Sequence, residues 1–302
     1  MEKIKPFEYK KNSSINDLIK EFEKLGFQAN KLAITVNIAE SMIKDKDCKV
    51  FLGVAGALVP AGMKNILVDM LNSKWVDVLV ITGANLTHDL VEDLGFSHFI
   101  GHESMDDSKL NKQGLVRMYN TLMPNKAYES LEAFFKKNWD EISRQTNIKD
   151  FLWTLGRLSP GNGILKTCYT NKTPIFCPAI SDSGIGLMMW GQLAQGKKAD
   201  IKAFEDLKEI LDISWTAKKT GVIYLGGGVP KNYIQQAMQF SKEANYGIQI
   251  TMDRPEFGGS SGAELKEGIS WGKLSPKATH VNLNCDVTIA LPLIYSALKE
   301  RI

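Results

Sequence analysis

Six short apolar segments, each followed by a loop of small residues and then by a helical pattern, constrain the fold of this chain most. They are KVFLGV, VDVLVIT, PIFCPAI, GVIYL, YGIQITM and THVNLN, at 49–54, 76–82, 174–180, 221–225, 246–252 and 279–284. Strands that alternate with helices favour parallel pairing. We therefore predict an α/β fold with a Rossmann-like, doubly wound, mostly parallel sheet, flanking helices and a single domain.

Two regions lie outside this repeating pattern. SSINDLIKEFEKLG at 13–26 has serines at its start, apolar residues at helical spacing and Gly26 as a stop, so it predicts a capped helix. We expect an N-terminal arm and helix over 1–25 and the α/β domain over 26–302. Residues 105–160 are more polar and helical, and we expect them to form an insertion on the sheet.

The composition excludes several classes of protein. The 302 residues are 44% hydrophobic and 24% charged, with a net charge of +3 and no bunched basic residues, so no nucleic-acid partner is indicated. The four cysteines are isolated, which favours neither zinc nor disulfides. The first residues lack an apolar signal core, and no uncharged apolar run has the length of a membrane span. We expect a cytoplasmic protein.

A glycine-rich loop is the best candidate for binding phosphate. In GVIYLGGGVPKNYIQQA, Gly226, Gly227 and Gly228 follow a strand and precede a helix. Glycines let backbone N–H groups approach an anion, and the helix N-terminus adds a favourable partial charge. The loop is not a G-x-G-x-x-G motif, so a tight turn of glycines without a ligand is an equal alternative.

Other strand ends carry residues with two interpretations. Thr82 and Gly83 in VITGANLTHDL either bind a ligand or begin a capped helix. Asp182 and Asp286 either cap the next helix or orient a ribose or a cationic substrate. The four histidines show no ligand spacing, so no metal site is expected.

The stretch EGISWGKLS at 267–275 combines an acid, an aromatic residue and a lysine. On a helix, Glu267 and Trp271 share one face, Gly272 ends the helix and Lys273 follows. Most lysines are solvated surface charges. A catalytic lysine needs a dry or cationic neighbourhood to lose its proton, and Trp271 supplies a dry wall and a face for a cation. Glu267 can hold a substrate ammonium or transfer a proton.

These segments resemble those of the deoxyhypusine synthase family. GISWGKL is similar to the family's active-site segment, and FLGVAGALVPAGM, VDVLVITGANLTHDL, CPAISDSGIG, TAKKTGVIYLGGGVPKN, PEFGGSSGAELKEGISWGKL and NCDVTIALPL match in the same order. The resemblance runs from about residue 26 to the C-terminus. It implies a Rossmann-like domain in a homotetramer, with NAD and the active sites at subunit interfaces.

Carried over position by position, the resemblance assigns roles to single residues. Lys273 becomes the nucleophile that forms an imine with the transferred aminobutyl group, and Trp271 and Glu267 line the amine pocket. The implied NAD contacts are Thr82, Gly83, Asp89, Asp182, Gly227, Gly228 and Asp286, with Gly226 in the same loop. Lys231 matches a lysine near that site.

The sequence also departs from the family pattern. Asn232 stands where the family has a histidine, and Leu187 replaces an aspartate that serves the polyamine. The 256–262 loop, EFGGSSG, is one residue shorter and lacks both of its aspartates. The remaining departures are Ala57 for an asparagine, and Thr87 and His88 for paired glutamates. This pattern resembles the deoxyhypusine synthase-like branch found in prokaryotes.

The sequence therefore predicts an NAD-dependent aminoalkyl transferase that acts on a polyamine or related amine. The acceptor is either a protein lysine or, favoured by the departures, a small diamine that yields a product such as homospermidine. One alternative is an NAD-dependent amine oxidoreductase that releases its imine to water. Another is an NAD-binding homologue without catalysis.

Overall fold

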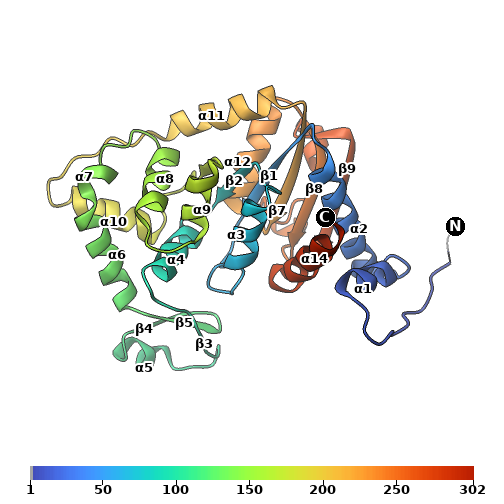
Figure 1. Ribbon diagram of the computed structural model, residues 1–302, viewed down its shortest axis with the longest axis horizontal. Coiled ribbons are helices and arrows are strands. Elements are labelled where there is room, and N and C mark those ends of the chain that lie inside the picture. Colours follow the sequence, from blue (N-terminus) through green and yellow to red (C-terminus); the bar gives the residue numbers. More distant parts are fainter. Residues whose placement is uncertain (1–2) are drawn as a thin grey trace. The chain divides into compact units, whose positions relative to one another are not determined.

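The computed structural model describes residues 3–302 in two compact units (Figure 1). The first unit comprises the chain up to Ala55, Trp75–Val78 and Glu209–Ile302, and the second comprises Gly56–Lys74 and Leu79–Lys208. Residues 1 and 2 of the predicted arm lie outside the described part. The predicted boundary between residues 25 and 26 is a different division of the chain, and it stays a prediction.

Four parallel strands form the centre of the first unit. They are β1 (Cys48–Val54), β7 (Lys219–Leu225), β8 (Ala244–Thr251) and β9 (Leu274–Asn284), paired in that order. Residues 220–225 of β7 are all buried. A parallel strand covered on both faces requires such a continuous apolar run, which explains why these strands were visible in the sequence.

Helices cover both faces of these strands. The helices of the first unit are α1 (Ile15–Phe22), α2 (Phe27–Lys44), the end of α11 (Ala203–Thr216), α12 (Gly228–Gln239), α13 (Glu267–Ser270) and α14 (Val287–Arg301), with the 3₁₀ turn η1 (Pro255–Phe257). Gly221 pairs with Val50, and a Cβ at Gly221 would lie 2.6 Å from Met42 of α2. Gly53, three residues after Val50, faces the other side, where a Cβ would lie 3.3 Å from Ile234 of α12.

The N-terminal helix is tied to the C-terminal one, and α1, α2 and α14 lie together (Figure 1). Ser14 caps α1 in a capping box with Asp17. The carboxylate of Glu300 accepts hydrogen bonds from the backbone N–H groups of Ile15, at 3.2 Å, and Asn16, at 3.0 Å. The predicted stop at Gly26 is wrong, because α1 ends at Phe22 and Gly26 precedes α2.

The second unit surrounds a short parallel pair, in which β2 (Val78–Ile81) pairs with β6 (Ile175–Phe176). Its helices are α3 (Lys64–Asn72), α4 (Gly83–Asp93), α5 (Asp107–Lys112), α6 (Lys126–Lys137), α7 (Trp139–Ile142), α8 (Ile148–Leu158), α9 (Ile164–Asn171), α10 (Gly184–Leu193) and the start of α11 (Ala203–Thr216). A separate antiparallel sheet, in the order β3-β5-β4, consists of β3 (Phe99–Ile100), β4 (Leu115–Met118) and β5 (Thr121–Pro124).

The α/β fold with mostly parallel strands and flanking helices is confirmed. All six predicted strands form, as β1, β2, β6, β7, β8 and β9. After β8, however, the expected helix is reduced to η1 and the four-residue α13, because the glycines of 258–262 interrupt it. Among the described helices, none has both the length and the apolar composition to cross a bilayer.

The packing of α2 on β7 makes a testable prediction. Gly221→Ala places a methyl group against Met42 and Cys48, and we expect it to lower the free energy of unfolding by about 1–3 kcal/mol. Gly191→Ala is the matched control, because its Cβ meets nothing within 4 Å and it lies inside α10. It should stabilise by about 0.5–1 kcal/mol. Urea unfolding at fixed protein concentration measures both. An equal response of the two variants would refute the packing account.

Candidate active site

Lys273 is fixed by a helix-terminating turn. The N–H of Lys273 donates to the carbonyl of Gly268 at 2.8 Å, and the N–H of Gly272 donates to the carbonyl of Ile269 at 3.1 Å. This is the Schellman pattern, and it needs the left-handed conformation of Gly272, whose φ is +67°. The predicted stop at Gly272 is confirmed, although α13 is only one turn long.

Lys273, Trp271 and Glu267 line the same pocket, a cavity of about 200 Å³ in the first unit. Its lining residues are Asn232, Gln235, Gly258, Gly259, Ser260, Ala263, Glu264, Glu267, Gly268, Trp271 and Lys273. The Nζ atom of Lys273 lies 5.0 Å from the centroid of the Trp271 ring, within the range of a cation–π contact. The structure thus brings together the three residues predicted to be catalytic.

The pocket contains a second carboxylate that the sequence analysis did not single out. Glu264 lines it together with Glu267, three residues later. Glu264 also pairs with the exposed Lys266 at 2.9 Å, and such a surface pair is weak. Glu264 lies before α13, which begins at Glu267, so helical spacing gave no signal for it in the sequence. Gln235, on α12, was missed as well.

The buried ammonium of Lys231 holds one wall of the pocket. Only 1% of Lys231 is exposed. Its Nζ donates to the Oε1 of Gln249 at 2.9 Å and to the carbonyls of Ser260 and Ala263 at 2.7 and 2.6 Å. Burial lowers the pKa of Lys231 to about 8; the charge of Glu267 opposes this shift. The side-chain amide of Gln249 also donates to the carbonyl of Ser261 at 2.7 Å. The side chains of Lys231 and Gln249 together therefore anchor the backbone of the 258–263 loop.

The glycine loop has one tightly packed position and one open position. A Cβ at Gly227 would lie 2.3 Å from the Cα of Ser261, so the protein's own loop excludes a side chain there. A Cβ at Gly228 would meet nothing within 4 Å. Gly226 and Gly228 have φ values of +77° and +57°. The open face at Gly228, where the first N–H groups of α12 lack partners within the helix, fits a phosphate group.

Asp286 caps the following helix, as one of its two interpretations predicted. Its Oδ1 accepts hydrogen bonds from the N–H of Thr288, at 2.7 Å, and from the hydroxyl of Thr288, at 2.6 Å. Asp286 is partly exposed, and these bonds use one of its two oxygens. A cofactor contact through the other oxygen stays a prediction.

In the second unit, Thr82 and Gly83 begin α4. The hydroxyl of Thr82 accepts a hydrogen bond from the side chain of Asn85 at 2.9 Å, and Thr82 makes no side-chain cap. A Cβ at Gly83 would lie 2.6 Å from the Cβ of Ser183, so α4 approaches the 181–183 loop closely there. Ser183 caps α10, which makes the capping interpretation of Asp182 wrong and leaves Asp182 exposed.

Asp89 is fully buried, and its contacts lie within the protein. Its two carboxylate oxygens accept hydrogen bonds from the N–H groups of Ile164, at 2.8 Å, and Leu165, at 2.9 Å, at the start of α9. Lys64 lies 3.3 Å away. Burial raises the pKa of Asp89 to about 6, and Lys64 opposes this shift. These contacts give Asp89 a structural role in anchoring α9, and its predicted contact with NAD stays a prediction.

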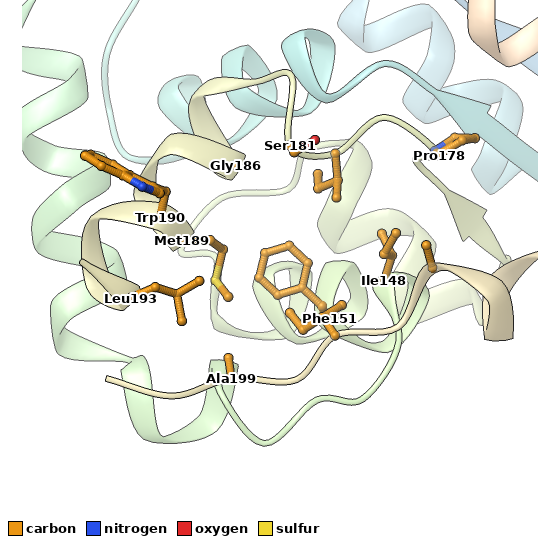
Figure 2. Close-up of a pocket in the computed structure, with 12 residues that line it drawn as sticks. Ile148, Phe151, Pro178, Ser181, Gly186, Met189, Trp190, Leu193 and Ala199 are labelled. Atoms are coloured by element: carbon orange, nitrogen blue, oxygen red, sulfur yellow. The ribbon is translucent and has the colours of Figure 1, made fainter. Parts of the chain in front are cut away.

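A larger cavity of about 400 Å³ lies entirely in the second unit, between α8 and α10 (Figure 2). The side chains of Phe151 and Met189 point toward its centre, and Trp190 turns away from it. None of its twelve lining residues is charged. An ammonium group there would lose its hydration without gaining a carboxylate, so this cavity does not suit a polyamine. Among the described residues, no cluster of histidine, cysteine and acidic side chains could hold a metal ion.

Comparisons with known proteins agree with the resemblance found in the sequence. The family model for deoxyhypusine synthase matches residues 17–298. A probable deoxyhypusine synthase 1 of Methanosarcina mazei is 40% identical over 294 residues, covering 96% of this chain and 92% of that protein. A probable deoxyhypusine synthase 2 of Archaeoglobus fulgidus is 40% identical over 283 residues, covering 90% and 94%. A crystal structure of a putative deoxyhypusine synthase from Entamoeba histolytica shares the fold, with a TM-score of 0.65, 18% identity and coverage of 97% and 96%.

The hydrogen bonds of Lys231 lead to a testable prediction about the stability of the pocket wall. Lys231→Met keeps an unbranched side chain but leaves three buried acceptors without their donor, at about 1–3 kcal/mol each. We expect the free energy of unfolding to fall by about 3 kcal/mol or more, and hydrogen exchange in 258–263 to accelerate. Lys266→Met, at an exposed lysine of the same stretch, should change stability by less than about 0.5 kcal/mol. Unchanged exchange in Lys231→Met would contradict this role.

Proposed function

Because the chain belongs to the deoxyhypusine synthase family, we propose that it moves an aminobutyl group from a polyamine, through an imine on Lys273, to a small diamine. Enzymes of this family are transferases that carry an aminobutyl group and use NAD as cofactor. The observation that supports our assignment is the pocket that Lys273, Trp271 and two carboxylates, Glu264 and Glu267, line together, with Lys273 over the Trp271 ring. The resemblance also leads us to propose a homotetramer with cofactor sites at its interfaces.

Lys273 is the nucleophile in this proposal. The glycine loop at Gly226, Gly227 and Gly228 would hold NAD, which would supply hydride chemistry at the carbon next to a polyamine nitrogen. The neutral amine of Lys273 adds to the oxidised carbon, and the C–N bond to the rest of the polyamine breaks, so that the leaving amine departs with a proton. Lys273 then holds the aminobutyl group as an imine. The acceptor amine displaces Lys273 from the same carbon, and reduction completes the product.

Three side chains bind the aminobutyl group and transfer protons during the reaction. The face of Trp271 attracts the ammonium end of the aminobutyl group, since an indole ring stabilises a cation above it. Glu267 and Glu264 are the lining groups that can take a proton from Lys273 and give one to the leaving amine. Asn232, in the same lining, cannot act as an acid or base.

The number of carboxylates favours a small acceptor. A small diamine acceptor carries two ammonium groups, and a cation taken out of water needs a partner for each charge. The pocket offers Glu264 and Glu267, which match the two ammonium groups of a diamine. The 258–260 wall contains two glycines and a serine and adds no charge. We therefore expect a small diamine to be a better acceptor than a lysine presented by a folded protein.

Product analysis tests this function. The enzyme is incubated with NAD and spermidine, either with putrescine or agmatine or with the precursor of the hypusine-bearing translation factor, and the products are identified by mass spectrometry. We expect an aminobutylated diamine, such as homospermidine from putrescine, and weak or absent labelling of the protein. Efficient labelling of the protein lysine without a small product would contradict the acceptor. Accumulation of an aldehyde would instead identify an amine oxidoreductase.

Two variants sharpen the assay. Lys273→Arg keeps the positive charge and removes the nucleophile, so neither acceptor should be modified. Asn232→His restores an acid–base group beside Glu267. Because a positioned acid–base group contributes about 10²–10⁴-fold, we expect transfer from spermidine to rise by about tenfold or more. If the transfer rate of Asn232→His equals that of the wild type, the side chain at position 232 takes no part in proton transfer.

A further inference from the structure

The cavity between α8 and α10 has no part in the function proposed above (Figure 2). Its volume of about 400 Å³ lies within the range of sites for small molecules. Ile148 and Phe151 of α8 are 4% and 1% exposed, so they form a floor away from solvent. A cavity of this size is a rare feature of a close-packed protein interior. Its volume and its buried floor are together typical of a ligand site.

The wall formed by the 180–186 segment is fixed by its own hydrogen bonds. The hydroxyl of Ser183 donates to the carbonyl of Ile180 at 2.6 Å and accepts from the N–H of Gly186 at 3.0 Å. A Cβ at Gly186 would lie 2.5 Å from the same carbonyl, so the start of α10 packs directly on the segment before it. This wall of the cavity is therefore preformed.

The wall formed by the 199–203 segment is tied to the start of α8. The N–H of Lys202 donates to the carbonyl of Thr146 at 2.8 Å, and Lys202 forms a parallel bridge with Asn147. Asn147 in turn caps α8, since its side chain accepts a hydrogen bond from the N–H of Asp150 at 2.7 Å. Because both walls are fixed within the protein, a ligand binds here with little loss of conformational entropy.

Charge complementarity limits the occupant to a neutral molecule. None of the twelve lining residues is charged. The lining side chains with a polar oxygen or nitrogen are Ser181 and Trp190, which are both exposed, and Trp190 turns away from the cavity (Figure 2). A charged group on the floor would lose its hydration without gaining a partner. The occupant therefore has an uncharged, apolar body, and any polar group that it carries lies at the exposed mouth.

The centre of the cavity favours an aromatic body. The ring of Phe151 and the thioether of Met189 both point toward the centre (Figure 2). A second ring can pack edge-on or offset against Phe151, because aromatic rings attract each other in these arrangements. The sulfur of Met189 adds a favourable contact with an aromatic ring, and its unbranched side chain adapts to the shape of the ligand. A saturated ring of the same size would gain neither contact.

We propose that the cavity between α8 and α10 is a binding site for a small, neutral aromatic molecule, such as a phenol or an indole. The site is distinct from the pocket of Lys273, since the two cavities share no lining residue. Ser183, which fixes one wall, also packs on α4, because a Cβ at Gly83 would lie 2.6 Å from the Cβ of Ser183. A ligand that binds the folded second unit therefore stabilises the contact between α10 and α4.

Nuclear magnetic resonance of the full chain with ¹³C-methyl methionine tests this site, with phenol and cyclohexanol as the probes. The two molecules share a hydroxyl group and the same ring size, and only phenol is aromatic. Met189 is one of 11 methionines, so its signal is assigned with Met189→Leu. We expect phenol to shift this signal until saturation, and to bind about threefold or more tightly than cyclohexanol. No saturable shift with phenol, or equal affinity for the two probes, would overturn the proposal.

Two variants locate the binding in this cavity. Ala199→Phe places a ring in the lining and should weaken the binding of phenol by about tenfold or more. Ala194→Phe is the matched control, because Ala194 is exposed at the end of α10 and lies outside the lining, so it should leave the affinity unchanged. Circular dichroism checks the fold of both variants, and Ala203→Phe, at another lining residue, replaces Ala199→Phe if that variant unfolds. Unchanged binding of phenol in the folded lining variant would overturn the site.

Two further titrations separate other occupants. Putrescine, which carries two charges, should leave the signal of Met189 unshifted, and a saturable shift would overturn the neutral character of the site. The titration with phenol is then repeated at a higher protein concentration. A response that disappears as the chain assembles would show that a second copy fills the cavity, and would overturn the proposal. Transfer products play no part in these measurements, so the proposed function stands or falls separately.

Discussion

The buried ammonium of Lys231 is the constraint on which the candidate active site depends. Its three acceptors lie on β8 and on the 258–263 loop, so one charge ties the glycine-rich wall of the pocket to the sheet. The opposite wall is fixed through the backbone, because the N–H of Ala244 in β8 donates to the carbonyl of Lys273 at 3.2 Å. The Schellman turn then holds Lys273 beside Trp271. A pocket held this way needs little reorganisation to receive a ligand.

The sequence was sufficient for the strands and for the turn at Lys273, because buried parallel strands and a left-handed Gly272 leave direct signals in the residue types. The sequence was insufficient where the role of a residue depends on contacts with residues that are distant in sequence. The requirement for Gly227 arises from Ser261, which is distant in sequence, and Asp89 holds the start of α9. Glu264 was missed because it lies in the loop before α13, and only the fold of that loop brings it into the pocket lining. Tertiary contacts, which a local pattern does not contain, decided these cases.

In the proposed reaction, one departure from the family pattern changes how protons move. Asn232 removes an acid–base group from the pocket lining and leaves proton transfer to Glu267 and Glu264. Under the proposed function, the loss of this group is a reason to expect a substrate that differs from that of the family.

Chemical trapping of the covalent intermediate tests the central claim most directly. The enzyme is incubated with NAD and a donor polyamine, treated with borohydride to reduce any imine, digested and examined by peptide mass spectrometry. The account predicts an aminobutyl group on the peptide that contains Lys273, dependent on NAD and absent from Lys273→Arg. Product formation by wild-type enzyme without a trapped adduct, or undiminished turnover in Lys273→Arg, would contradict it.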